Sequence, residues 1–236
     1  MVLLLYTLIV WRTVKMKLSN ETKEVLKNFS TINQNLVIKE GSSISTMSAM
    51  KNIIANASVS ENFPKEFAIY DLNEFLAALS LFDKPELDFK DDFVVITEEG
   101  SKGKSLKYWY SDPSVVTTPS REITMPSRDI TYTFSSSTLS EVQRAAAVIG
   151  APDMVLENGK LKVTDKKNST ANDYETSLDV NENGADYKFW FKVENLKIIP
   201  GEYEVEVSSK NISHFKNSSK DIEYFIALEP ESSYSA

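Results

Sequence analysis

A proline-rich stretch at residues 111–128, near the middle of the chain, limits the possible folds more than any other feature. Pro113, Pro119 and Pro126 lie there among serine and threonine residues. Proline fixes its own φ and disfavours a helical conformation in the residue before it, so this composition predicts an extended connector. A chain of 236 residues is long enough for two domains. We therefore expect two domains, with the boundary in residues 119–128.

Two amphipathic helices are predicted in the first half. Apolar side chains recur every three or four residues across residues 18–32, and Ser19 is suited to cap the start of that helix. Asp71 and Glu74 form a capping-box-like pair at the start of a second helix. Short runs with strand-like composition separate the helices, so this half predicts mixed α+β structure.

The second half repeats this order. Thr138 and Glu141 fit a capping box, and Gly150 suits the end of the same helix. Asn158–Gly159 and Asn183–Gly184 are each expected to join two strands as a hairpin, and a short helical turn is expected near residues 193–197. The predicted strands cover residues 33–38, 53–59, 67–70, 93–97, 106–110, 130–134, 153–157, 160–164, 175–180, 187–191, 203–207 and 223–228.

Few residues are available for catalysis or metal binding. There is no cysteine and one histidine, His214, which excludes thiolate chemistry and makes a histidine-based triad or metal site hard to build. We interpret His214 as a surface imidazole on a strand. The segment from Asp179 to Gly184 is similar to the opening of a calcium-binding loop, but Trp190 occupies the position of the required glutamate, so we favour a β-turn.

An acidic cluster, Asp88, Asp91 and Asp92, is a second candidate metal site, for Mg²⁺. A two-metal site needs carboxylates from separate elements, and we interpret these residues as a solvated loop. The sequence contains no glycine-rich phosphate-binding motif and no nucleophile elbow. We therefore predict a protein that is not an enzyme and uses no cofactor or metal.

The charge distribution bears on nucleic-acid binding. A formal net charge of −8 argues against indiscriminate binding, which requires a basic face. An acidic protein can still have a surface that is locally basic. On the predicted helices, Lys23 and Lys27 lie opposite the apolar face, Arg144 also points away from the core, and Lys197 lies near the short helical turn. Taken alone, these cations are ordinary solvated charges.

Residues 1–15 do not fit the rest of the chain. The apolar run at residues 2–11 is shorter than the roughly 20 residues of a transmembrane helix. Arg12 and Lys15 follow this run, whereas a secretory signal has its basic residues before it. We expect residues 1–15 to be an extraneous N-terminal extension and not a targeting signal, with membrane anchoring as the alternative.

Five blocks of residues are spread along the chain. They are MKLS at 16–19 with LKNFSTIN at 26–33, AIYDLN at 68–73 with FL at 75–76, WYSDPS at 109–114, PGEY at 200–203, and Tyr224 with ALE at 227–229. These blocks resemble, in the same order, the sliding clamp of T-even-type bacteriophages. The resemblance begins at Met16 and is weak at residues 42–66 and 160–183.

This resemblance implies an α+β fold with two similar clamp-type domains, residues 16–118 and 129–236, joined by a connector at residues 119–128. Antiparallel sheets would lie outside and helices inside. Three subunits would join head to tail into a ring around double-stranded DNA, held without sequence specificity. The DNA-facing inner-surface residues would be Lys23, Lys27, Arg144 and Lys197.

The resemblance also implies partners and a location. An ATP-driven clamp loader would place the ring on DNA, and the ring would tether the replicative DNA polymerase through a C-terminal peptide that docks near the connector. The family also supports late viral transcription, and the expected location is the cytoplasm of the infected bacterial host. The alternative function is a β-rich phage structural or assembly protein, and a hydrolase using the acidic cluster ranks below it.

Overall fold

The computed structural model describes residues 15–101, 103–119, 121–181 and 184–235. The elements of the first half are α1 (Asn20–Ile32), β1 (Leu36–Ile38), β2 (Gly41–Met47), β3 (Ile53–Phe63), β4 (Phe67–Ile69), α2 (Leu72–Ser80), β5 (Pro85–Phe89), β6 (Phe93–Glu98), β7 (Ser105–Trp109) and the 3₁₀ turn η1 (Pro113–Val115). Those of the second half are β8 (Ile130–Phe134), α3 (Ser136–Ile149), β9 (Asp153–Glu157), β10 (Lys160–Thr164), β11 (Tyr174–Ser177), β12 (Val180–Asn181), β13 (Asp186–Lys192), η2 (Val193–Asn195), β14 (Tyr203–Ser208), β15 (Ile212–Asn217), β16 (Ile222–Ala227) and β17 (Ser233–Ser235).

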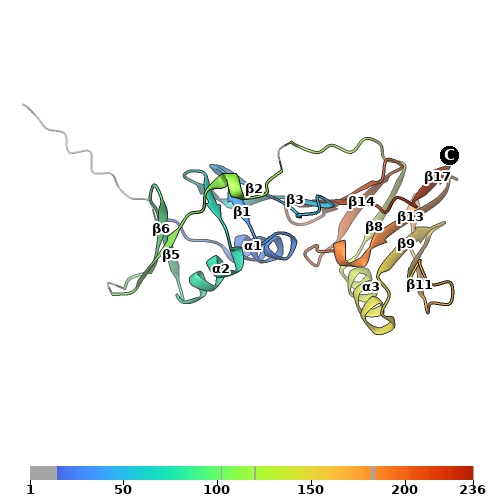
Figure 1. Cartoon of the computed structure of the whole chain (residues 1–236), viewed down its shortest axis with the longest axis horizontal. Coiled ribbons are helices and arrows are strands. Elements are labelled where there is room, and N and C mark those ends of the chain that lie inside the picture. Colours follow the sequence, from blue (N-terminus) through green and yellow to red (C-terminus); the bar gives the residue numbers. More distant parts are fainter. Residues whose placement is uncertain (1–14, 102, 120, 182–183, 236) are drawn as a thin grey trace, which may run out of the picture.

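A nine-stranded antiparallel sheet runs through both halves, in the order β12-β8-β14-β15-β16-β3-β2-β1-β4. The halves join where β16 pairs with β3, from Ile222 opposite Ala57 to Ile226 opposite Ile53. A five-stranded sheet (β11-β10-β9-β13-β17) and a three-stranded sheet (β5-β6-β7) lie at the two ends of the molecule (Figure 1). The three α-helices lie on one side of the long sheet, and the connector crosses on the other side (Figure 1).

Strand pairing is repeated between the two halves. The order β4-β1-β2-β3 in the first half corresponds to β13-β9-β10-β11 in the second, and β5-β6-β7 corresponds to β14-β15-β16. In each half the strand that precedes the second helical element, β4 or β13, pairs with the strand that follows the first helix. The fold is therefore α+β, with two halves of similar topology.

Apolar residues of the helices hold them against the sheets. On α1, Val25, Leu26, Phe29 and Ile32 recur at helical spacing and are buried, with Leu26 and Phe29 fully enclosed. Burying a leucine or phenylalanine side chain stabilises the fold by about 1.5–3 kcal/mol relative to leaving it exposed. One continuous core includes residues of both halves. The opposite, polar face of α1 is therefore fixed toward solvent.

Most helix boundaries agree with the sequence prediction. Ser19 caps α1 by accepting a hydrogen bond from the Thr22 amide, and Asp71 caps α2. Gly150 ends α3 in the left-handed region, at φ 67°. The predicted capping box at Thr138 was wrong. Ser135 is the N-cap of α3, and its hydroxyl accepts from the Thr138 amide at 3.0 Å, so the helix begins one turn earlier.

One predicted hairpin forms and the other does not. Asn158–Gly159 joins the paired strands β9 and β10. The second prediction paired residues 175–180 with 187–191, but β11 pairs with β10, and β13 pairs with β9 and β17. Residues 178–181 leave the five-stranded sheet, and β12 pairs with β8 in the long sheet. Glu182 and Asn183 lie outside the described residues.

The prediction for residues 1–15 falls outside the described residues except at Lys15. The Lys15 ammonium lies 3.1 Å from a carboxylate oxygen of Glu86, and Met16 forms a bridge with Leu87. No helix in the described part of the chain has the length and apolar composition to span a membrane.

Candidate nucleic-acid interface

The start of α1 is anchored to strand β3 by Glu61. The Glu61 carboxylate accepts hydrogen bonds from the Ser19 amide and the Thr22 hydroxyl. Burial alone would raise the pKa of Glu61, but these hydrogen bonds outweigh burial and lower it. A negative charge at the N-terminus of a helix also interacts favourably with the helix dipole. Glu61 therefore fixes the direction of α1 and of the residues on its outer face.

Lys23 and Lys27 lie on this outer face, beside α2. Together with Asn73, Ser80, Leu76, Ala77, Leu79 and Phe82 of the α2 segment, they line a groove of about 530 Å³. Lys27 is exposed and Lys23 is half-buried. Neither ammonium group has an ion pair among the described residues. Two uncompensated cations can attract an anion to this groove.

Arg144 is exposed on α3, on the same side of the long sheet as α1 (Figure 1). Glu141 lies one turn earlier on the helix and accepts a hydrogen bond from the Tyr174 hydroxyl at 3.1 Å. This bond is the main cause of a raised pKa at Tyr174, whereas the positive charge of Arg144 lowers it. Arg144 therefore lies in a mixed electrostatic environment. On α1, Glu24 lies one turn before Lys27, but Glu24 pairs with Lys220.

Lys197 lies where the second half contacts the end of α1. Its ammonium donates to the Thr31 carbonyl at 2.8 Å, and its own carbonyl accepts from the Asn28 side chain at 3.0 Å. Cations near the last carbonyls of a helix interact favourably with its dipole. Lys197 therefore lies next to α1, whereas Arg144 lies on α3. The Lys197 ammonium group is already hydrogen-bonded to the end of α1.

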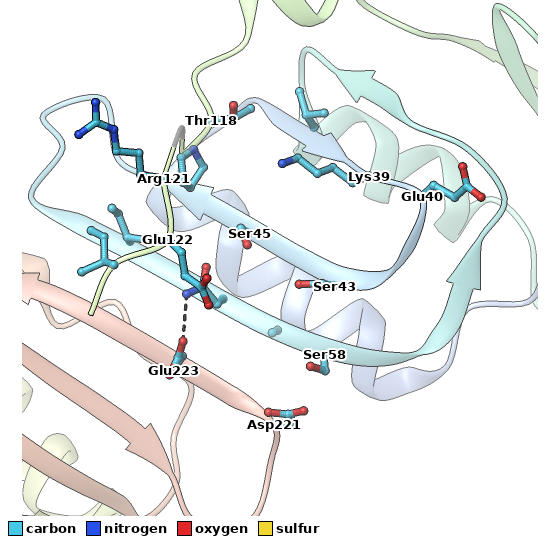
Figure 2. Close-up of a pocket in the computed structure, with 16 residues that line it drawn as sticks. Lys39, Glu40, Ser43, Ser45, Ser58, Thr118, Arg121, Glu122, Asp221 and Glu223 are labelled. Atoms are coloured by element: carbon cyan, nitrogen blue, oxygen red, sulfur yellow. Dashed lines mark hydrogen bonds between the residues drawn. The ribbon is translucent and has the colours of Figure 1, made fainter. Parts of the chain in front are cut away.

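A pocket of about 470 Å³ lies on the opposite side of the long sheet, between the connector and strands β2 and β3 (Figure 2). Figure 2 shows Arg121 and Glu122 of the connector passing over these strands, with Lys39 and Glu40 at the far end. Apolar side chains of Val37, Ile54 and Ile123 contribute to the lining. Charged residues of both signs surround this apolar area.

Only the general position of the connector was predicted from the sequence, and none of the residues that line this pocket was. Its lining runs from Val37 to Glu223 and comes together because β16 pairs with β3. Glu223 accepts a hydrogen bond from Asn56 across this junction at 3.0 Å. Pairing between strands more than 160 residues apart leaves no local sequence signal.

The other candidate sites do not assemble. The described residues contain no group of three or more histidine, cysteine, aspartate or glutamate residues placed to hold a metal ion. Asp88 pairs instead with Lys90 at 2.8 Å. His214 is half-buried, not a free surface imidazole, because it stacks on Phe225 with 4.5 Å between ring centroids and bonds Glu223 at 2.8 Å.

Comparison with known proteins defines the class. The family described as "DNA polymerase processivity factor" matches residues 19–118, and the family described as "gp45 sliding clamp, C terminal" matches residues 130–230. Each match covers one of the two halves that share the same strand pairing. The chain therefore belongs to the sliding-clamp family of DNA polymerase processivity factors, whose members are not enzymes.

Individual relatives support this assignment. The sliding clamp of Vibrio phage KVP40 is 37% identical, over 91% of this chain and 99% of the relative. The sliding clamp of Escherichia phage RB69 is 28% identical, over 93% of this chain and 99% of the relative. The solved structure of PCNA from Thermococcus kodakaraensis has a TM-score of 0.68 at 16% identity, and the match covers 91% of this chain and 99% of that one. This last similarity shows the fold.

Proposed function

We propose that three copies of the chain join head to tail into a ring that encloses double-stranded DNA without reading its sequence. The main support is that both halves match clamp families. In addition, α1, α2 and α3 lie on one side of a continuous sheet (Figure 1). On this proposal the helices face the hole. Enclosure retains DNA without tight contacts, so a chain of net charge −8 needs few inward cations.

The repeated strand pairing supports a specific interface between subunits. Within the chain, the halves join where β16 of the second half pairs with β3 of the first. The corresponding strands are β7 and β11, each at the edge of its sheet. Unpaired edges are templates for pairing with another chain. Pairing of β7 with β11 of the next subunit would repeat the internal junction, and Trp109 on β7, 61% exposed, would be covered there.

Lys23, Lys27, Arg144 and Lys197 are proposed to face the DNA. Lys23 and Lys27 have the stronger support because their ammonium groups are unpaired among the described residues, whereas Lys197 already bonds Thr31. The proposed domains are residues 16–118 and 129–236, with the connector at 119–128. The limits of the two matching families, 118 and 130, lie close to these boundaries.

We further propose that the pocket under the connector receives the C-terminal peptide of the replicative polymerase. Lys39 and Arg121 would donate hydrogen bonds to a peptide carboxylate, and Ile54 and Ile123 would contact apolar side chains of the peptide. An ATP-driven loader would open the ring, and the same surface would serve late viral transcription in the cytoplasm of the infected host. Relatives from phages support this setting.

Two measurements test the ring and its processivity function. Sedimentation should give three times the protomer mass, and primer extension should lengthen when the protein and its loader are added to the polymerase. Replacing Lys23 and Lys27 with glutamate should leave the mass unchanged, because both lie opposite the apolar face, and should weaken DNA retention at low salt, where screening is least. Unchanged retention of DNA would show that α1 does not face the hole of the ring.

The peptide pocket has its own test. Ile123→Asp should shorten primer extension while leaving the trimer mass unchanged, since Ile123 lines the pocket. Thr124→Asp adds the same charge at the next, exposed residue and should have a smaller effect. Equal effects would show that connector charge, and not the pocket, matters.

A further inference from the structure

We propose that the groove between α1 and α2 binds the sugar–phosphate backbone of one DNA strand, while α3 acts as a nearly neutral spacer. The duplex would then contact three sites in a ring of six domains. This inference rests on the proposed enclosure of DNA and specifies which inner surface the duplex contacts.

Two cations and one amide lie along the groove. Lys23 and Lys27 line one wall, and Asn73 and Ser80 line the other. Ammonium and amide groups are common donors to phosphate oxygens, whereas the Ser80 hydroxyl already donates to the Ala77 carbonyl at 2.7 Å. The eight described residues that line the groove include no acidic side chain. Lys104 adds a third cation at one end, where its ammonium donates to the Leu81 carbonyl and lies 5.3 Å from the Phe82 ring centroid.

The spacing of the two cations suits a single strand. Four residues of an α-helix span about 6 Å, so Lys23 and Lys27 can contact neighbouring phosphates of one strand. The apolar floor, formed by Leu76, Leu79 and Phe82, offers no hydrogen bonds to bases. Contacts of this type position a duplex without reading its sequence.

The exposed face of α3 differs in chemistry. Its exposed residues are Ser137, Ser140, Gln143, Arg144, Ala147 and Val148. Arg144 is the one cation among them, and Glu141 lies one turn away. Val148 is 79% exposed, so an apolar side chain occupies part of the surface that would face the duplex. This face can limit the width of the hole but has little attraction for phosphate.

The absence of cysteine makes a matched experiment possible. Ser80→Cys in the groove and Ser140→Cys on α3 are the same conservative change at two exposed helical positions, and each adds the only thiol of the chain. The same photocrosslinker would be attached to each variant. Each ring would be threaded onto a linear duplex through its free end, and both ends would then be blocked.

The Ser80 probe should crosslink to DNA several-fold more than the Ser140 probe at low salt. Adding Lys23→Gln and Lys27→Gln should reduce the Ser80 yield to about the Ser140 level. Equal yields, a higher Ser140 yield or no crosslinking by either probe, with the ring still retained, would overturn the groove assignment but not enclosure. Loss of retention by both labelled rings would instead overturn the proposed enclosure, and the groove assignment with it.

Discussion

Replacing Tyr224 with phenylalanine should weaken the junction between the two halves. The Tyr224 hydroxyl accepts from the Ile199 amide at 3.1 Å and donates to the Asn28 side chain on α1 at 2.9 Å. Tyr224 and Ile199 are both buried, so water cannot replace the lost bonds. Burial also raises the pKa of Tyr224, as expected for a dry site.

The cost follows from the groups left without partners. Leaving a buried donor or acceptor unpaired costs about 1–3 kcal/mol. Taking about 2 kcal/mol, and about 2–4 °C per kcal/mol for a chain of this size, Tyr224→Phe should lower the melting temperature by roughly 4–8 °C. Differential scanning calorimetry of both proteins at one fixed concentration measures this change with any contribution from subunit association held constant.

Tyr132 provides the matched control. Its hydroxyl is buried and has no hydrogen-bond partner among the described residues. Removing an unpaired buried hydroxyl should leave stability unchanged or raise it, so Tyr132→Phe and Tyr224→Phe should differ in sign or in size. A melting temperature of Tyr224→Phe equal to that of the wild type would refute this prediction. An equal decrease in melting temperature for Tyr132→Phe and Tyr224→Phe would refute it as well.

Three further changes test other parts of the structure. A Cβ at Gly201 would lie 2.5 Å from the Asn217 side-chain nitrogen, and the Asn217 amide is held in place because its oxygen accepts from the Ser219 and Lys220 backbone amides. Gly201→Ala should therefore lower the free energy of unfolding by about 1–3 kcal/mol in urea titrations, and an unchanged midpoint would contradict this packing. The folded-state pKa of Glu61 is lowered from 4.5, so the ionised carboxylate should make the wild type more stable than Glu61→Gln at neutral pH. This difference in stability should disappear as the pH falls from 4.5 through the lower folded-state pKa. A difference that persists in acid would show that the ionised carboxylate is not its cause. If β7 lies in the proposed interface, Trp109→Ala should raise the protein concentration at which the trimer dissociates in sedimentation experiments, whereas Val148→Ala should not. Identical dissociation of the two variants would exclude β7 from the interface.

Local signals in the sequence predicted the helices well. Ser19, Asp71 and Gly150 mark helix ends through side-chain caps or a left-handed backbone, and these depend on neighbouring residues alone. Strand β2 was not predicted because Gly41–Met47 is rich in serine and buries few apolar residues, so its alternation is weak. Strand β5 was also missed.

The larger sheet could not be read from local patterns. Asn183–Gly184 looked like a hairpin, but the strands on either side pair with different neighbours because the chain moves from the five-stranded sheet to the long one. The β3–β16 junction likewise depends on partners far apart in sequence.

The candidate site was predicted in part. Helical periodicity placed Lys23 and Lys27 on the outer face of α1, and the structure agrees with that placement. The sequence did not reveal that Lys197 bonds the end of α1, since Thr31 lies 166 residues away. The contribution of each of the four cations to DNA contact stays a prediction.

Retention on end-blocked DNA tests enclosure most directly. The protein would be threaded onto a short linear duplex, one sample would have both ends blocked by bulky proteins, and a second would keep one end free. After transfer to high salt, which screens phosphate contacts, an enclosing ring should stay on the doubly blocked duplex and leave the open one. Equal release from the two duplexes would contradict enclosure.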